Sequence, residues 1–345
     1  MRHSIRRLAL TILLTLPALA LAQNQPKVIN ARFTTVAVTH GLAPQLEALK
    51  KEAGPLWTGY SIPVTEKSSS GWTTSSTTYL ERDQNDSRES GSSQASESFD
   101  HTFILLRVAN GAVEKLRFDL PDRQLDAGNL PFVWLTGVAP EDSIATLSTL
   151  AQQPAARHLR DQAVVAIALH NSTAATPALT AFTAPANDLS LREKAAFWLA
   201  NMRGHDGFLV IQRLLRNDAD PALREKLTFD LTLTKDPAAL PELIRAAHQD
   251  ASPQVRKQAQ FWMAQKGGKL VAKDLRAQAE NDPDSQLRKS AVFAISRLPQ
   301  PEATPELIQL ATTSKDPAVR KQAVFWLGQS SDPKALDYLT QLLKQ

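Results

Sequence analysis

The sequence predicts a mainly α-helical solenoid over residues 140–345, a small α+β domain over residues 23–139 and a leader over residues 1–22. Three observations predict this organisation. An arginine recurs every 32 residues through the second part of the chain. The apolar residues around each arginine are spaced as on one face of a helix. In the first part, two segments in which apolar and polar residues alternate flank an Asn-Gly pair, which is typical of a β-hairpin.

Residues 1–22 have the composition of a secretory signal peptide. Arg2, Arg6 and Arg7 precede an apolar stretch, and Ala20 and Ala22 supply the small residues that a signal peptidase reads. The stretch is too short to span a bilayer, and no later segment approaches about 18 apolar residues. We therefore expect a protein exported to the periplasm or the outside, without stable membrane insertion after cleavage. An uncleaved anchor is the alternative.

Charge and cysteine content exclude several classes of function. The net charge of +4 falls to +1 without the three leader arginines, so nothing favours nucleic acid as a partner. The chain contains no cysteine. This excludes disulfides, thiolate nucleophiles, cysteine-bound zinc and a lipid-modified cysteine.

The α+β domain is predicted element by element. Residues 31–38 alternate as a strand, residues 43–53 form a short helix, and residues 56–62 form a second strand. The Asn110-Gly111 turn joins the strands 102–109 and 112–120, and residues 131–135 form a further short strand. We expect a mostly antiparallel sheet that also caps the first repeat.

Two further features of this domain bear on function. Serine and threonine make up almost half of residues 68–98, which is typical of a mobile loop. Trp57, Tyr60, Asp126 and Trp134 form a set of residues that would suit the lining of a pocket.

The solenoid is predicted from the residues around the recurring arginine. The arginines are Arg160, Arg192, Arg224, Arg256, Arg288 and Arg320. A small or apolar residue follows three positions later, and a large apolar residue follows seven positions later. These positions share one stripe of a helix, and the small residue allows a neighbouring helix to approach closely.

The starts of these helices are also marked in the sequence. Asp220, Ser252, Asp282 and Asp316 each precede a proline, and Asp188 is the expected cap before Arg192. A capping oxygen accepts from free N–H groups of the first turn, and proline at the first position sacrifices no donor. The recurring aspartates and arginines are also expected to pair between successive repeats, as a charge ladder.

A second set of apolar helical segments alternates with the arginine helices. They cover residues 141–152, 174–184, 205–217, 237–249, 269–280, 303–313 and 333–344. The array therefore contains six helix pairs and a final helix. Neither helix of a pair buries its apolar face alone, so the stack forms one continuous core.

The residues 316–328, followed by 332–336, resemble the HEAT-like repeat named after the phycobilisome lyases. Its pattern is Asp-Pro-x-Val-Arg-x-x-Ala-Ala-x-Ala-Leu-Gly, and the resemblance covers about residues 141–345. The whole chain is similar to exported bacterial HEAT-repeat proteins without an assigned activity. The resemblance thus implies a fold and leaves the function open.

Two enzyme families with this repeat do not fit the sequence. Deoxyhypusine hydroxylase has paired His-Glu iron ligands, and no His-Glu dipeptide occurs here. The lyases act on intracellular antenna proteins, whereas we expect this chain to be exported.

One departure from the generic repeat predicts a binding surface. The fifth position after the arginine, normally variable, is phenylalanine in five repeats, and the sixth is tryptophan in alternate repeats. The candidate partner-binding residues are Phe197, Phe229, Phe261, Phe293, Phe325, Trp198, Trp262 and Trp326. We call this set the aromatic ladder. An aromatic ladder on the concave face would bind an extended peptide or another apolar ligand. Alternatively, the rings pack sideways under the stems of Lys257, Lys289 and Lys321.

The sequence predicts no catalytic, cofactor-binding or metal-binding residue. The histidines lack the spacing of metal ligands, and no nucleophile, phosphate or dinucleotide motif occurs. We therefore expect a scaffold that binds a protein or peptide rather than an enzyme, with no cofactor. The alternative is an enzyme or ligand-binding protein whose site lies in residues 23–139.

Overall fold

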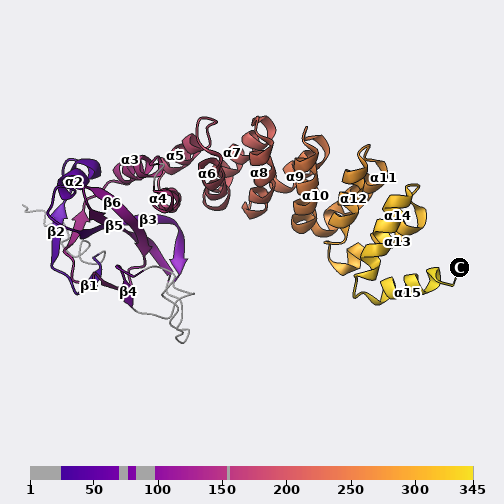
Figure 1. The fold of residues 1–345 in the computed structure, drawn as a ribbon, viewed down its shortest axis with the longest axis horizontal. Helices are drawn as coiled ribbons and strands as arrows, with labels where there is room; N and C mark the ends of the chain where they lie inside the picture. Colours follow the sequence, from indigo (N-terminus) through magenta and orange to yellow (C-terminus); the bar gives the residue numbers. More distant parts are fainter. Residues whose placement is uncertain (1–24, 70–76, 83–97, 154–155, 345) are drawn as a thin grey trace, which may run out of the picture. The chain divides into compact units, whose positions relative to one another are not determined.

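The computed structural model describes residues 25–69, 77–82, 98–153 and 156–344. The chain divides into two compact units, Met1–Thr146 and Leu147–Gln345 (Figure 1). The predicted leader lies outside the described residues. In the part of the chain that is described, no helix is both long and apolar enough to cross a membrane.

Up to residue 136, the described part of the first unit contains strands of 3 to 14 residues and one helix. Its elements are β1 (Lys27–Ile29), β2 (Phe33–Ala37), α2 (Leu42–Leu49), β3 (Leu56–Ser69), β4 (Thr77–Tyr79), β5 (Ser98–Ala109), β6 (Ala112–Asp119), β7 (Gln124–Asp126) and β8 (Phe132–Thr136). Every strand and helix expected in this region is present. Strand β4 lies inside the stretch predicted as a loop, where β-branched Thr77 and Thr78 suit a strand. Residues 70–76 and 83–97 of that stretch are outside the described ranges.

The five-stranded sheet of the first unit is mixed and the three-stranded sheet is parallel, so the expectation of a mostly antiparallel sheet is wrong. One sheet has the order β2-β8-β3-β5-β6 and the other has the order β1-β7-β4. Strand β5 is antiparallel to β3 and β6, but β8 is parallel to β2 and β3, and β7 is parallel to β1 and β4. The late strands β7 and β8 insert between earlier ones, and such long-range pairing leaves no local pattern in the sequence.

The hairpin of β5 and β6 forms where the Asn-Gly pair predicts it. Asn110 and Gly111 both have positive φ, 52° and 73°. Two left-handed residues in a row match the twist of the strands on either side, and Asn and Gly adopt this conformation at low cost.

The repeats form six helix pairs and a final helix, as predicted. We call α3 (Pro140–Ala151), α5 (Ala175–Phe182), α7 (Gly204–Asn217), α9 (Ala239–Gln249), α11 (Ala272–Asn281) and α13 (Gln300–Thr313) the first helices. The second helices, which carry the arginines, are α4 (Arg157–Leu169), α6 (Leu189–Met202), α8 (Pro221–Leu233), α10 (Pro253–Gly267), α12 (Ser285–Ile295) and α14 (Pro317–Gly328). A 3₁₀ turn, η2 (Gly268–Val271), precedes α11, and α15 (Pro333–Leu342) ends the array.

The recurring arginines pair with aspartates of the following repeat, which confirms the charge ladder. Arg224 binds both carboxylate oxygens of Asp250 at 3.0 Å, and Arg288 binds Asp316 at 2.9 Å. Further pairs are Arg160–Asp188, Arg192–Asp218 and Arg256–Asp282. Several of these pairs are buried rather than exposed, so their loss would cost more than that of a surface ion pair.

The helix caps follow the predicted residues with two exceptions. The side chains of Asp188, Asp220 and Asp316 each accept a backbone N–H of the first turn. Ser252 occupies the cap position but its side chain makes no capping hydrogen bond. Helix α12 is capped by Asp284 instead of Asp282, which ends α11 and whose side chain pairs with an arginine.

Candidate partner-binding surface

In Figure 1 the second helices α4 and α6 lie below the first helices α5 and α7, on the inner side of the curve. Each second helix contacts the next second helix more extensively than successive first helices contact each other. In a curved stack, the elements that approach more closely are on the inside. Close approach is possible because a small or apolar residue, such as Ala195 or Ala259, is completely buried three positions after each arginine.

The aromatic ladder is continuous over four repeats. Phe229 on α8 contacts Trp262 on α10, with ring centroids 4.8 Å apart, and Trp262 contacts Phe261 at 4.7 Å. Phe261 stacks on Phe293 at 6.0 Å with an interplanar angle of 10°. Trp326 on α14 then contacts Phe293 at 5.3 Å and Phe325 at 5.0 Å. Rings from residues almost 100 positions apart in sequence thus form one apolar strip.

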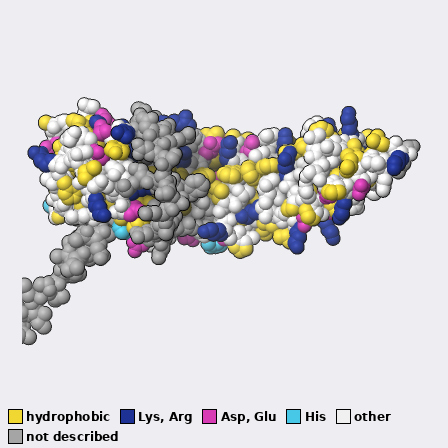
Figure 2. Space-filling model, turned by 90° about the horizontal axis from the view of Figure 1, so that it is seen from below, with side chains coloured by type: hydrophobic (Ala, Val, Ile, Leu, Met, Phe, Trp, Pro, Cys, Tyr) yellow, Lys and Arg dark blue, Asp and Glu magenta, His cyan; other side chains and the backbone are white. Residues whose placement is uncertain are grey.

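The ladder is half-buried. This lies between the exposed ladder and the sideways-packed rings that the sequence analysis considered. Phe197, Phe229, Phe261 and Phe293 are partly exposed, and Phe325 is 52% exposed. The rings contact each other sideways, but their outer edges remain open to solvent. Figure 2 shows hydrophobic side chains along the middle of the repeat unit, on the face that is seen from below in Figure 1.

The tryptophans of the ladder have their indole N–H edge turned away from solvent. The indole N–H groups of Trp198, Trp262 and Trp326 are shielded from solvent and have no hydrogen-bond acceptor within the described ranges. Each indole meets the preceding phenylalanine edge-on, at interplanar angles of 75–87°. An edge-on ring pair is a favourable arrangement. The indole N–H groups are thus buried, whereas the tryptophan rings remain partly exposed, like most of the phenylalanines.

The ladder is interrupted at Asp230, a feature that the sequence did not single out. Phe197 and Trp198 on α6 form a pair of their own, 5.1 Å apart. Asp230 occupies the tryptophan position on α8 and is 4% exposed. Burial, with a smaller effect of Glu193, raises the pKa of Asp230 to about 8, so its carboxyl is mostly protonated at neutral pH.

The side chains of the set Trp57, Tyr60, Asp126 and Trp134 are buried rather than open to solvent. Trp57 and Tyr60 are fully buried and Trp134 is 2% exposed, and Trp57 and Trp134 belong to one core cluster. The hydroxyl of Tyr60 shares a hydrogen bond of 2.8 Å with Ser143, and burial raises the pKa of Tyr60. Asp126 accepts from Asn30 and from the backbone of Gly128. Trp57 and Tyr60 lie three residues apart on β3 and therefore point to opposite faces of the sheet, where both are buried.

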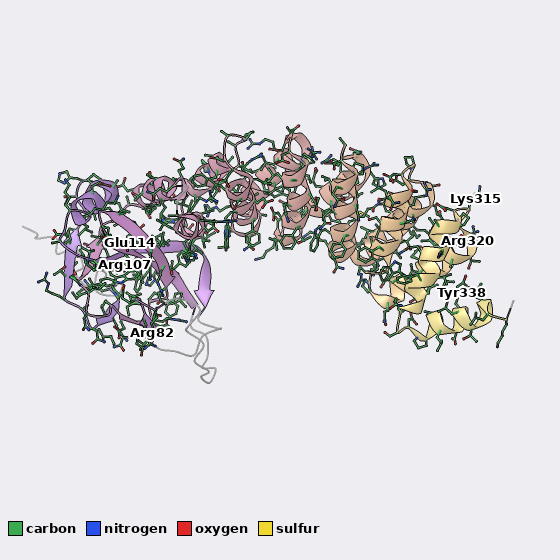
Figure 3. All side chains as sticks on the ribbon, in the orientation of Figure 1. Arg82, Arg107, Glu114, Lys315, Arg320 and Tyr338 are labelled. Carbon is green, nitrogen blue, oxygen red and sulfur yellow. The ribbon has the colours of Figure 1, made fainter. Side chains whose placement is uncertain are left out.

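A polar network surrounds one edge of this core. The indole N–H of Trp57 donates to Glu81 at 2.7 Å, and Glu81 also accepts from Arg107 at 3.0 Å. Arg107 further binds Glu114, which lies next to it in Figure 3. Burial acts to raise the pKa of Glu81, but the hydrogen bonds from Arg107 and Trp57 and the charges of Arg107 and Lys115 together lower it. The charged groups of this network are therefore paired with one another. The described residues contain no group of His, Asp and Glu that could hold a metal ion.

Comparisons with known proteins identify the repeat. Residues 272–345 match the family model of HEAT repeats. No curated protein matches the chain. Human deoxyhypusine hydroxylase in complex with glycerol is 18% identical over 60% of this chain and 80% of its own, with a TM-score of 0.32. The CpcE–CpcF complex of phycocyanin lyase from Nostoc sp. is 23% identical over 46% of this chain and 100% of its own, with a TM-score of 0.33. YibA of Escherichia coli is 19% identical over 58% of this chain and 76% of its own, with a TM-score of 0.37.

Proposed function

Because the second unit of this chain is a HEAT-repeat solenoid, we propose that it binds an extended segment of a partner protein along the aromatic ladder. The observation that carries the proposal is the continuous contact of rings from Phe229 to Phe325 on the inner helices, with their edges open to solvent. Rigid aromatic side chains in a contiguous strip are typical anchors of an interface.

The compartment is part of the same proposal. The basic, apolar and small-residue segments of residues 1–22 support export, so the partner would be a periplasmic or extracellular protein. A second candidate function, catalysis in the first unit, loses its main support because the aromatic set expected to line a pocket fills the core.

The test is a triple substitution, Phe229→Glu, Phe261→Glu and Phe293→Glu. The tagged wild type and variant would be used to capture partners from the exported fraction of the native host. We expect the variant to lose the partner, with an affinity reduced by at least about tenfold, since aromatic anchors contribute most of the energy of an interface.

A matched control changes the same number of apolar residues on other elements. Leu209, Leu270 and Leu336 are 46%, 75% and 67% exposed, on α7, η2 and α15. Their replacement by Glu should leave binding intact. Circular dichroism would verify that each variant folds. If the triple variant unfolds, the single substitution Phe325→Glu, at the most exposed ring of the ladder, takes its place. Equal recovery of the partner by a folded ladder variant contradicts the proposal.

A further inference from the structure

The charge next to the aromatic ladder changes sign along the repeats. The residue directly after each recurring arginine lies one helical turn before the position of the ladder phenylalanine, which is Val165 in the first repeat, and on the same face. In the first three repeats it is Asp161, Glu193 and Glu225, and in the last three it is Lys257, Lys289 and Lys321. The sequence pattern is therefore acidic up to α8 and basic from α10 onward.

The basic half of this row is not neutralised. Lys257 and Lys321 are exposed and Lys289 is half-buried. None of the three has an ion pair with another residue of the described ranges. In the acidic half, Asp161 is paired with Lys194 at 3.5 Å, and Glu193 and Glu225 have no ion pair within those ranges. Unpaired cations beside exposed apolar rings form a surface complementary to a ligand that combines carboxylates with apolar side chains.

Arg297 adds a fourth cation at the end of α12. Its guanidinium lies over the rings of Phe293 and Trp326, at 4.8 and 5.3 Å from their centroids. The side chain is exposed and has no carboxylate partner among the residues that the structure describes. The stacked rings hold the guanidinium in place, so its donors are presented to solvent in a fixed orientation.

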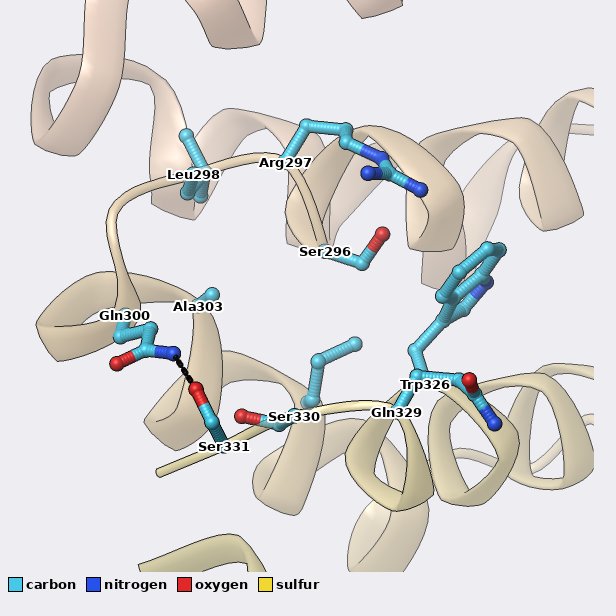
Figure 4. Close-up of a pocket in the computed structure, with 10 residues that line it drawn as sticks. Ser296, Arg297, Leu298, Gln300, Ala303, Trp326, Gln329, Ser330 and Ser331 are labelled. Atoms are coloured by element: carbon cyan, nitrogen blue, oxygen red, sulfur yellow. Dashed lines mark hydrogen bonds between the residues drawn. The ribbon is translucent and has the colours of Figure 1, made fainter.

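A polar pocket adjoins Arg297. It has a volume of about 170 Å³ and lies between the end of α12, the start of α13 and the end of α14. Arg297 and Trp326 border one side, and Gln300 and Ser331, joined by a hydrogen bond of 2.6 Å, border the other (Figure 4). Trp326 belongs both to the pocket and to the ladder. A segment that follows the ladder would therefore reach the pocket without leaving the surface.

We propose that the partner segment is acidic where it crosses the last three repeats, with apolar side chains on Phe261, Phe293 and Phe325 and a carboxylate group in the pocket beside Arg297. The lysine row would bind further carboxylates along the segment. This inference rests on the proposed function, because it assigns the chemistry of the ligand to the same surface.

The test uses the full chain and three peptides of 12 residues with identical apolar positions. The intervening positions carry Glu in one peptide, Gln in the second and Lys in the third, and each peptide bears an uncharged fluorophore for anisotropy. We expect the Glu peptide to bind about tenfold more tightly than the Gln peptide and the Lys peptide to bind most weakly. This preference should shrink as the salt concentration rises, because exposed charges are screened.

Substitutions of single cations test which residues cause the preference for the Glu peptide. Arg297→Gln and Lys289→Gln should each reduce the affinity for the Glu peptide about threefold or more and leave the Gln peptide unchanged. Lys273→Gln, at an exposed lysine on first helix α11, is the matched control and should change neither affinity.

The outcomes separate the two proposals. If the Glu and Gln peptides bind equally, or if the cation variants have no effect, the acidic partner is wrong, while loss of binding in Phe261→Ala, Phe293→Ala would still support the ladder. If that double variant binds all peptides as the wild type does, the ladder itself is wrong. Absence of binding by all three peptides contradicts both.

Discussion

At the scale of single residues, the inner face combines features with opposite energetic effects. Phenylalanines with open edges stay accessible to a ligand, whereas Asp230 is a carboxyl group buried beside them. A buried carboxyl is less costly when it is protonated, which is the physical cause of its raised pKa. The surroundings of Asp230 include Glu193, which raises this pKa further, and Lys226, which lowers it.

Asp230→Asn should remove a pH dependence of stability. Since the pKa of Asp230 is about 8 in the folded chain and lower when unfolded, the unfolding free energy should fall as pH rises from about 4 to about 8. Above this range the wild type should be less stable than the variant, by on the order of a few kcal/mol. Thermal unfolding between pH 5 and 9 measures the difference. Asp337→Asn, at an exposed position on α15, is the control. Parallel pH profiles of Asp230→Asn and wild type would refute the assignment.

Arg224→Ala should be far more damaging than Arg320→Ala. Arg224 binds Asp250, whose side chain is only 4% exposed, so removing the guanidinium leaves a buried carboxylate without its cation. Such a loss costs about 3–5 kcal/mol. Arg320, at the same position of the last repeat (Figure 3), donates to the carbonyl of Ser314 at 2.7 Å and has no carboxylate partner in the described part. Its loss should cost about 1 kcal/mol.

Urea unfolding monitored by circular dichroism compares these two variants. The midpoint of Arg224→Ala should lie clearly below that of Arg320→Ala, with Arg320→Ala close to wild type. Similar midpoints for the two variants would show that the ion pair between repeats contributes little.

At the scale of elements, the helix pairs depend on close approach at a few positions. A Cβ atom on Gly207 of α7 would lie 2.0 Å from the carbonyl oxygen of Leu199 on α6. Only glycine allows the two helices to meet there. Gly328, at the end of α14, has no atom within 4 Å of such a Cβ position. Both glycines are helical, but only Gly207 lacks the space for a side chain.

Gly207→Ala should destabilise the chain by about 2 kcal/mol or more, because the added methyl group overpacks the contact between α6 and α7. Gly328→Ala should leave stability unchanged or raise it by about 0.5–1 kcal/mol, since alanine favours the helix. The shift of the thermal midpoint measures both. A Gly207→Ala variant as stable as Gly328→Ala would contradict the close contact.

At the scale of the whole molecule, the repeats interact mainly with their neighbours. Contacts of α8 are with α6, α7, α9 and α10, and α14 contacts α12, α13 and α15. Stability in such an array is approximately a sum of repeat and neighbour terms, so a local defect should remain local.

Leu327→Ala and Leu231→Ala test this locality. Both leucines are at the same repeat position and almost completely buried, so each truncation should cost about 2–5 kcal/mol. Hydrogen exchange followed by mass spectrometry should show faster exchange confined to α12, α13, α14 and α15 for Leu327→Ala. For Leu231→Ala it should extend to repeats on both sides. Uniformly faster exchange across all helices in Leu327→Ala would contradict the nearest-neighbour description.

The sequence by itself determined the repeat, because the physical causes are local and recur. An arginine, a small or apolar residue and a large apolar residue at fixed spacing define a buried helical stripe. Their repetition with a 32-residue period gives the position of each helix that carries an arginine. The Asn110-Gly111 turn is likewise determined locally, by the low cost of positive φ at both residues. The same period revealed which residues form the aromatic ladder.

Tertiary structure alone decided how those features are used. The insertion of β8 between β2 and β3 brings together strands distant in sequence, and no local pattern encodes their direction. The half-buried state of the ladder, the burial of Asp230 and the position of Arg297 over two rings all depend on the distance between neighbouring helices. That distance is set by packing across repeats, and it determines which side chains a partner can reach.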